Sequence, residues 1–348
     1  MPNLPPEPLA SPGRRPAHGI GNGDLVSLRG GSIGGNGNGQ GGDAAFVHIA
    51  PRSMPMPVLI AVPHAGRAYP GETLAQMRDP GLSQLRLEDR YIDKVAVEIA
   101  RATGTGLLVA HAPRAVLDLN RAADDVDWDM VEQPRAGAGT NRNARNPAGA
   151  TRNGNARARS GLGLVPRRLP GFGEIWRSKL PRAELVRRID CIHRPYHEFL
   201  EHELARIRDA WGAALLIDLH SMPPLRRQNA GSNGEEAAPQ IVLGDRFGTS
   251  CNHAVVARAF QYLEARGCPA AHNRPYSGGY VLDRHASPAR GIHAVQVEVC
   301  RAAYLDDALS QPTAAAGPLA KLLAGLVREL GAETAGLGAG GQLAQAAE

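Results

Sequence analysis

Short apolar runs that end in polar residues recur along the chain. Residues 58–62 (Val-Leu-Ile-Ala-Val) are wholly apolar and lead through a proline into His64. Residues 214–224 have the same form and place His220 just before two prolines, and residues 294–299 carry Glu298 among apolar neighbours. Apolar runs of this length predict buried strands of a largely parallel sheet.

Amphipathic segments alternate with these runs. In residues 86–103 apolar side chains recur every four positions, which predicts a helix with Asp89 and Asp93 one turn apart on one face. Residues 181–210 predict a long helix or helix pair, interrupted near Pro195. The alternation predicts a single α/β domain whose central sheet is mixed, mostly parallel and flanked by helices.

Composition sets the boundaries of this domain. Residues 1–45 are rich in Gly, Pro and Asn and cannot bury enough apolar surface to fold, so we expect them to be disordered. The folded domain is expected over 46–331, with a mobile insertion at 135–160 that is rich in Gly, Asn, Ala and Arg. Its last helix is predicted at 312–331, and a disordered tail at 332–348.

Charge, cysteine content and hydropathy exclude several classes of protein. The net charge of +5 is modest and is concentrated in the expected insertion, and no basic-aromatic or zinc-finger pattern accompanies it. The four cysteines form no Cys-x-x-Cys pair, which favours reduced thiols. No apolar run approaches a membrane span, and no signal-peptide core is visible. We therefore expect a cytoplasmic protein that binds neither nucleic acid nor membrane.

Candidate chemistry lies at the ends of the predicted strands. In open α/β sheets, ligands bind beyond the carboxyl ends of the strands, where His64 and His220 fall. Asp218 points to the same side as His220 and is expected to support it. Two histidines at strand ends, with Glu298 on a third strand, predict a mononuclear zinc hydrolase. Ser221 does not predict a serine hydrolase, because no Gly-x-Ser-x-Gly motif surrounds it.

A series of short motifs runs in order from about Val58 to Asp306. They are Pro-His-Ala-Gly (63–66), Glu-Asp-Arg-Tyr-Ile-Asp (88–93), Leu-Asp-Leu-Asn-Arg (117–121), Gly-Leu-Gly-Leu-Val-Pro-Arg (161–167), His-Arg-Pro-Tyr-His (193–197), Ile-Asp-Leu-His-Ser-Met-Pro (217–223), Leu-Gly-Asp-Arg-Phe-Gly (243–248), Asn-Arg-Pro-Tyr-Ser-Gly-Gly-Tyr (273–280) and Gln-Val-Glu-Val (296–299). Together they resemble the N-formylglutamate amidohydrolase family. The resemblance implies a fold related to zinc carboxypeptidases and aspartoacylases, and zinc-assisted hydrolysis of an amide.

The resemblance also implies one Zn²⁺ ion held by His64, His220 and a third protein ligand. Carboxypeptidase-like sites use His-x-x-Glu, but Arg67 stands three residues after His64 in this chain. The third ligand must therefore come from elsewhere, and Asp89 is the first candidate. Asp93 is the alternative, and would otherwise orient a ligand imidazole.

Further roles follow from the same resemblance. Glu298 is expected to act as the general base, the alternative being a buried ion pair with an arginine. Arg114 resembles the arginine that stabilises the oxyanion, although a surface role is equally open. Asn120 and Arg121 are expected to hold a substrate carboxylate, because a guanidinium contacts both carboxylate oxygens. Arg274 is a candidate for the second carboxylate of a glutamate-like substrate.

These expectations define a small-molecule enzyme. The leading hypothesis is hydrolysis of the formyl amide of N-formyl-L-glutamate to glutamate and formate, in histidine degradation. A second hypothesis is hydrolysis of another N-acyl amino acid or a small peptide. A third is a binding protein that kept the fold and lost the metal, which the presence of His64, His220 and Glu298 disfavours. The sequence leaves the oligomeric state open.

Overall fold

The computed structural model describes residues 25–34, 42–132, 156–169, 171–225 and 238–346. Most of the described strands form one sheet of eight, in the order β1-β2-β4-β3-β7-β10-β8-β9. These strands are β1 (Leu25–Gly30), β2 (Phe46–Pro51), β3 (Val58–Val62), β4 (Gly106–Ala110), β7 (Ala214–Met222), β8 (Ile241–Gly244), β9 (Ala270–His272) and β10 (Ile292–Cys300). A separate hairpin pairs β5 (Arg168–Leu169) with β6 (Gly173–Glu174).

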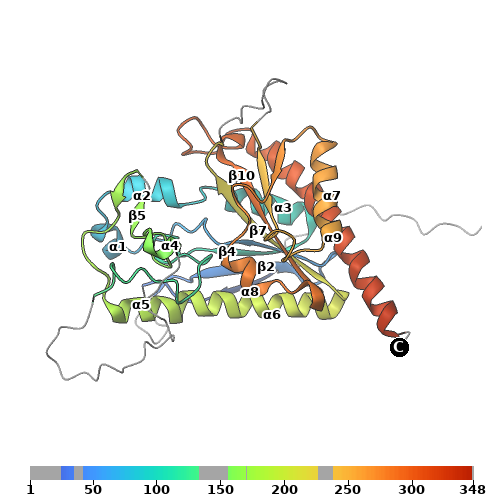
Figure 1. Ribbon diagram of the computed structural model, residues 1–348, viewed down its shortest axis with the longest axis horizontal. Helices are drawn as coiled ribbons and strands as arrows, with labels where there is room; N and C mark the ends of the chain where they lie inside the picture. The colour runs from blue at the N-terminus through green and yellow to red at the C-terminus, as the bar shows by residue number, and fades with distance from the viewer. Residues whose placement is uncertain (1–24, 35–41, 133–155, 170, 226–237, 347–348) are drawn as a thin grey trace, which may run out of the picture.

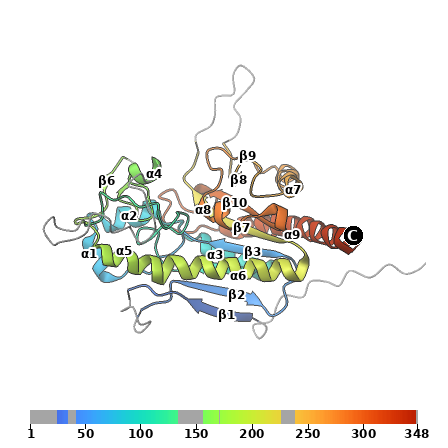
Figure 2. The ribbon, with the colours of Figure 1, turned by 60° about the horizontal axis from the view of Figure 1, so that its bottom comes forward.

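The sheet is mixed, with a parallel centre. Strands β4, β3, β7 and β10 run parallel to one another, and β8 runs parallel to β9. Pairing is antiparallel between β1 and β2, between β2 and β4, and between β10 and β8. Figure 2 shows β1 and β2 at one margin of the molecule, with β8 and β9 toward the opposite margin. This arrangement confirms the predicted mixed, mostly parallel sheet.

Helices cover both faces of the sheet (Figure 1). They are α1 (Gly71–Gln76), α2 (Pro80–Leu87), α3 (Ile92–Thr103), α4 (Ala156–Arg159), α5 (Arg182–Arg188), α6 (Arg194–Trp211), α7 (His253–Glu264), α8 (Tyr280–His285) and α9 (Ala316–Ala346). Val58, Ile60 and Val62 of β3 pack with α3, α7 and α9, whereas Leu59 and Ala61 pack with α5, α6 and α8. Because successive strand residues face opposite sides, a strand covered on both faces must be wholly apolar, as β3 is.

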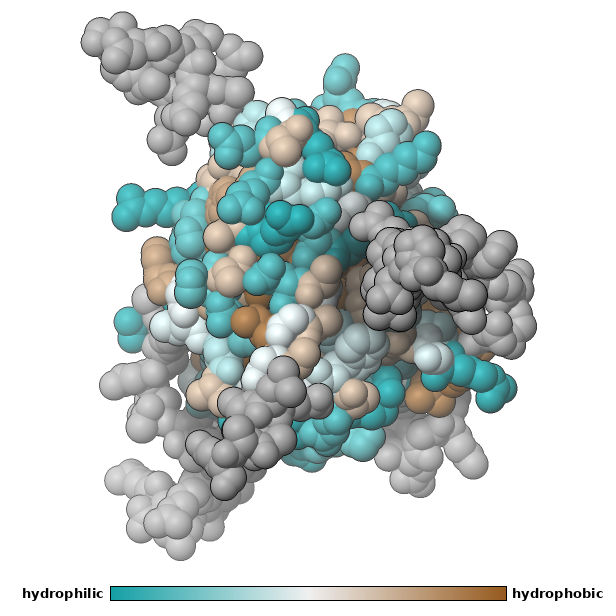
Figure 3. Space-filling view, turned by 90° about the vertical axis from the view of Figure 1, so that its right-hand side faces the viewer, coloured by the Kyte–Doolittle hydropathy of each residue, from teal (hydrophilic) through white to brown (hydrophobic). Residues whose placement is uncertain are grey.

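The outer surface mixes polar and apolar residues. Figure 3 shows the side toward which the end of α9 points, where teal and tan residues are interspersed. Among the described parts of the chain, no helix combines the length and the apolar character that a membrane span requires.

The helix predicted over residues 86–103 is in fact two helices. α2 ends at Leu87 and α3 begins at Ile92, and Tyr91 before α3 has a φ of 60°. The backbone N–H of Asp89 donates to the carbonyl of His64 (2.9 Å) in the connecting turn. Asp89 and Asp93 therefore do not share a helical face, contrary to the prediction from periodicity.

The predicted interruption near Pro195 is confirmed. A π-helical turn (Ile189–His193) separates α5 from α6, and Pro195 lies in the first turn of α6. Proline has no N–H to donate to the carbonyl four residues earlier, that of Cys191. That carbonyl accepts instead from the backbone N–H of Ser32 (2.8 Å).

Both ends of the chain differ from the expectation of disorder. Within the segment 1–45, residues 25–30 form β1, and Ile33 is buried. At the other end, α9 continues through most of 332–348, because its alanines favour helix and because Gly338 packs against the carbonyl of Trp211. Residues 1–24, 347–348 and most of the insertion expected at 135–160 lie outside the described residues.

Candidate metal and catalytic site

The candidate site lies where three central strands end. β7 and β10 are parallel neighbours, and their register places His220 directly opposite Glu298. β3 is the next strand beyond β7, and His64 follows it by two residues. The fold thus brings together the two histidines predicted at strand ends and Glu298 of the third predicted strand.

His64, Asp89 and His220 converge as a candidate metal site. Each offers one ligand atom, all three atoms lie within 4.8 Å of one another, and all three residues are buried. Oδ2 of Asp89 lies 3.1 Å from Nδ1 of His220 and 3.8 Å from Nδ1 of His64. Two imidazoles and one carboxylate are a donor set that suits zinc, so these residues fit the predicted ion.

A separate carboxylate contacts the other ring nitrogen of each histidine. Nε2 of His64 lies 2.7 Å from Oδ1 of Asp118, and Nε2 of His220 lies 2.9 Å from Oδ2 of Asp218. A histidine that donates its Nε2–H to a carboxylate presents the lone pair of Nδ1 to a metal. The support expected from Asp218 is thus seen, whereas no separate role was predicted for Asp118.

Arg301 fixes Asp89 and was not singled out in the sequence. Its NH2 group donates to Oδ1 of Asp89 (3.1 Å) and to the carbonyl of Glu88 (2.7 Å), and its Nε donates to Oγ of Ser221 (3.1 Å). Burial opposes the charge on Asp89, but His220, His64 and Arg301 hold the pKa of Asp89 below its ordinary value. Asp89 is therefore a carboxylate, with Oδ2 directed at the histidines.

Asp93, the alternative third ligand, is engaged elsewhere. Arg67 donates from NH1 and NH2 to its two carboxylate oxygens (3.1 and 2.6 Å). The arginine that replaces the expected Glu after His64 therefore pairs with the competing acid. Asp93 does not belong to the cluster of His64, Asp89 and His220.

Glu298 is a buried carboxyl group beside the cluster. Its Oε1 accepts a hydrogen bond from Nε2 of Gln296 (2.8 Å). Burial raises the pKa of Glu298 to about 7, the positive charges of His220 and Arg114 oppose this rise, and the charge of Asp89 adds to it. A carboxyl group with a pKa in this range can both accept and return a proton near neutral pH.

Arg114 faces the same group of charges. Its Nε donates to Oδ2 of Asp118 (2.9 Å), and its side chain is 26% exposed. Burial opposes its charge, but Asp118, Asp89 and Glu298 together raise the pKa of Arg114. Arg114 is therefore a fixed cation at the edge of the site, as an oxyanion-stabilising role requires.

Asn120 and Arg121 are buried and already have protein partners. Oδ1 of Asn120 accepts from the backbone N–H of Val281 (2.9 Å), and its Nδ2 donates to Oε1 of Gln296 (3.4 Å). Arg121 is buried and donates from Nε to the carbonyl of Leu162 (3.0 Å) and from NH1 to that of Asn120 (2.9 Å). Their role toward a substrate carboxylate stays a prediction.

The loop after β9 carries the predicted Arg274. Arg274 is exposed and has no hydrogen bond or ion pair to another described residue. Tyr276, two residues later, is half-buried, and burial together with the charge of Glu298 raises its pKa. The role predicted for Arg274 stays a prediction.

Sequence comparison relates this chain to known proteins. The sequence profile of the family described as N-formylglutamate amidohydrolase matches residues 56–305. The chain belongs to the N-formylglutamate amidohydrolase family. It is 30% identical over 287 residues to an N-formylglutamate deformylase of Pseudomonas aeruginosa, which covers 79% of this chain and 91% of that protein. A deformylase of Pseudomonas putida is likewise 30% identical over 273 residues, 74% of this chain and 88% of that protein.

A solved structure has the same fold. The crystal structure of N-formylglutamate amidohydrolase from Ralstonia eutropha JMP134 superposes with a TM-score of 0.69 at 27% identity, covering 87% of this chain and 100% of that chain. The family that the motifs resemble is therefore confirmed. The matched region, 56–305, contains each of the predicted site residues.

Proposed function

We propose that this family member hydrolyses the formyl amide of N-formyl-L-glutamate, releasing glutamate and formate in the cytoplasm as a step of histidine degradation. The observation that carries the proposal is the buried cluster of His64, Asp89 and His220 beside Glu298. The names of the deformylase relatives supply the substrate.

The proposed cofactor is one Zn²⁺ ion held by Nδ1 of His64, Nδ1 of His220 and a carboxylate oxygen of Asp89. Bound zinc makes water acidic enough to ionise near neutral pH and polarises a carbonyl group. Asp118 and Asp218 keep the proton of each imidazole on Nε2, so that both Nδ1 atoms face inward. Their removal would let the imidazoles rotate or change tautomer.

Glu298 is proposed to move the proton. It takes a proton from the water that attacks the formyl carbon, and it gives that proton to the nitrogen when the C–N bond breaks. The water oxygen leaves in formate, and the nitrogen leaves as the amino group of glutamate. A carboxyl group with a pKa of about 7 is suited to both transfers at neutral pH.

The substrate is proposed to be oriented by cations on either side of the cluster. Arg114 stabilises the oxyanion that forms on the formyl carbon, because its guanidinium is fixed by Asp118 near Glu298. Arg121 with Asn120 holds one substrate carboxylate, and Arg274 holds the second. These three assignments rest on the resemblance of their motifs.

Purified protein tests the proposal directly. Removal of metal by a chelator should abolish release of formate from N-formyl-L-glutamate, and Zn²⁺ should restore it. Glu298→Gln should keep the metal and lower kcat by about 10²–10⁴-fold, since the carboxylate is lost and the shape is kept. Full activity of the metal-free protein would refute the proposed role of the metal.

A panel of substrates distinguishes hydrolysis of N-formyl-L-glutamate from the alternative functions. N-acetyl-L-glutamate, N-formyl-L-leucine and N-formylglycine vary the acyl group and the side chain in turn. Preference for another member of the panel would identify a different N-acyl amino acid hydrolase on the same fold. Zinc binding without turnover of any member would favour a binding protein.

A further inference from the structure

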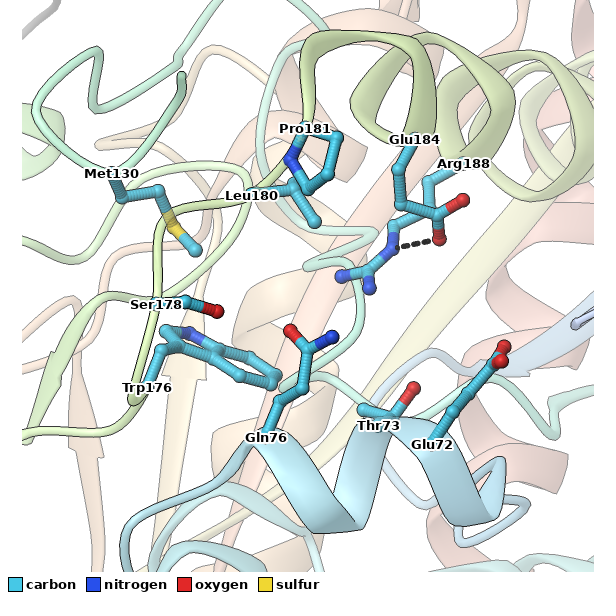
Figure 4. Close-up of a pocket in the computed structure, with 10 residues that line it drawn as sticks. All are labelled: Glu72, Thr73, Gln76, Met130, Trp176, Ser178, Leu180, Pro181, Glu184 and Arg188. Carbon is cyan, nitrogen blue, oxygen red and sulfur yellow. Dashed lines mark hydrogen bonds and ion pairs between the residues drawn. The ribbon is translucent and has the colours of Figure 1, made fainter.

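A cavity of about 220 Å³ lies between α1, residues 176–181 and α5 (Figure 4). None of its lining residues belongs to the candidate metal and catalytic site. Because a cavity of 150 Å³ holds a benzene molecule, this one has room for a ligand of roughly nine non-hydrogen atoms. That is the size of a small amino acid.

The lining has an apolar side and a polar side. The apolar side is formed by Met130, Trp176 and Leu180. On the polar side, the guanidinium of Arg188 points toward Gln76 (Figure 4). A cavity with this division fits a ligand that carries a charged group on a short apolar body.

Arg188 is a buried cation with one open donor group. It is only 6% exposed, and it donates from Nε to Glu184 (2.8 Å) and from NH1 to the carbonyl of Val116 (2.9 Å). Its NH2 group has no hydrogen-bond partner among the described residues. These contacts fix the guanidinium in advance, so an anionic oxygen in the cavity would bind NH2 without further ordering of the side chain.

Glu184 does not cancel this positive charge. Arg187 donates to both of its carboxylate oxygens (2.7 and 2.8 Å), so that two arginines share one carboxylate. Glu72, by contrast, is exposed at the rim and has no ion pair or hydrogen bond to another described residue. Glu72 and Arg188 both line the cavity. A purely anionic ligand would meet repulsion from Glu72, whereas a zwitterion matches both charges.

We infer that this cavity is a binding site for a small free α-amino acid with an apolar side chain. The carboxylate of the ligand contacts Arg188, its ammonium group contacts Glu72, and its side chain packs on Trp176 and Met130. The ligand therefore needs both charged groups as well as an apolar body.

Fluorine NMR of the whole chain, labelled with 5-fluorotryptophan, tests this inference. The chain has three tryptophans, of which Trp176 lines the cavity and Trp211 at the end of α6 serves as an internal reference. Trp176→Phe assigns the resonance. L-Valine should shift the Trp176 resonance saturably and leave that of Trp211 in place. Isovalerate and L-valinamide, which each lack one charged group, should bind about tenfold or more weakly, because each loses a charge-assisted contact.

Matched substitutions separate the cavity from binding elsewhere. Glu72→Gln should weaken L-valine several-fold, since the ammonium contact is lost. It should not weaken isovalerate, which has no ammonium group and is released from the repulsion by Glu72. Glu98→Gln, at an exposed position of α3, should change neither affinity. The inference is overturned if L-valine does not move the Trp176 resonance saturably, if L-valinamide binds as tightly as L-valine, or if Glu72→Gln leaves the affinity for L-valine unchanged.

Discussion

At the scale of single residues, each candidate metal ligand has its own charged partner. The pairs are His64 with Asp118, His220 with Asp218, and Asp89 with Arg301. A ligand held in this way keeps its donor atom aimed at the cluster before any metal binds, which lowers the cost of binding. The six residues come from five separate parts of the chain, since only Asp218 and His220 share a strand, so the site depends on the fold as a whole.

Asp89 and Asp93 can be told apart by metal content. Asp89→Asn should lower the zinc that the protein retains after dialysis, because the amide is a poorer ligand and loses the charge that Arg301 stabilises. Asp93→Asn should retain zinc, since Asp93 pairs with Arg67 outside the cluster. The expected loss for Asp89→Asn is about tenfold or more in zinc affinity. A larger loss for Asp93→Asn than for Asp89→Asn would reverse the assignment.

Arg121→Lys tests the proposed recognition of the substrate carboxylate. Lysine keeps the charge but cannot make the bidentate contact with the substrate carboxylate. This loss should lower kcat/KM for N-formyl-L-glutamate by about tenfold to a hundredfold. The loss should be much smaller for N-formylbutylamine, which has no carboxylate. Zinc content should stay the same.

The opposite result has a clear structural meaning. Equal losses for both substrates would show that Arg121 acts by holding the carbonyls of Leu162 and Asn120 in place. Arg274 would then be the better candidate for the carboxylate, and Arg274→Lys would be the next variant to compare.

At the scale of helices and strands, local patterns predicted the three strands that carry the site, β3, β7 and β10. The strands at 58–62 and 214–222 are wholly or mostly apolar, because both of their faces are covered. Periodicity failed at residues 88–91, where the turn is fixed by the hydrogen bond from Asp89 to the carbonyl of His64. Contacts of that kind join distant parts of the chain and leave no local pattern.

Asp118 and Arg301 were not predicted as site residues for the same reason, because their partners are distant in the sequence. Asp118 stood within the Leu-Asp-Leu-Asn-Arg motif, and Arg301 directly follows the strand of Glu298. Both are buried charges, and a buried charge requires a partner, but only the fold identifies that partner. The register that sets His220 opposite Glu298 is likewise decided by the pairing of β7 with β10.

Gly66 should be needed to position the loop after β3. A Cβ atom at this position would lie 2.2 Å from the backbone oxygen of Ala112, so Gly66→Ala must push two backbone segments apart. We expect a loss of about 1–3 kcal/mol in the free energy of unfolding, together with lower zinc affinity because His64 is nearby. Gly71→Ala is the matched control, since a Cβ there meets nothing within 4 Å. Urea unfolding should show no loss of stability for Gly71→Ala, and an equal loss for both variants would contradict the steric explanation.

At the scale of the whole molecule, a buried group of histidines joins α6 and α8 to the segment that carries Leu119 and Arg121. Nδ1 of His197 on α6 lies 2.9 Å from Nε2 of His285 on α8, and Nε2 of His197 lies 3.0 Å from the carbonyl of Leu119. Nε2 of His193 lies 2.8 Å from the carbonyl of Arg121. These contacts tie two helices to the segment that carries Asn120, so the charge state of the histidines affects the stability of the domain.

Acid should destabilise the protein through these histidines. Burial lowers the pKa of His193 to about 4 and that of His285 to about 3, whereas an unfolded histidine has a pKa near 6.5. As pH falls from about 6.5 toward 4, the unfolded chain takes up protons that the folded chain does not. The free energy of unfolding should therefore decrease with falling pH, by up to about 1.4 kcal/mol per pH unit for each such histidine. Above about pH 6.5 the histidines are neutral in both states, and the protein keeps its full stability in this respect.

Urea unfolding of the metal-free protein at pH 7.0, 6.0 and 5.0 measures this dependence. His285→Gln removes one buried titrating group, so the decrease between pH 6 and 5 should be smaller than in the unmodified chain by about 1 kcal/mol. His253→Gln is the control, because His253 is exposed at the start of α7. The comparison uses the slope against pH, so a lower overall stability of His285→Gln does not affect it. Equal slopes for His285→Gln and the unmodified chain would show that His285 is protonated in the folded state as readily as in the unfolded one.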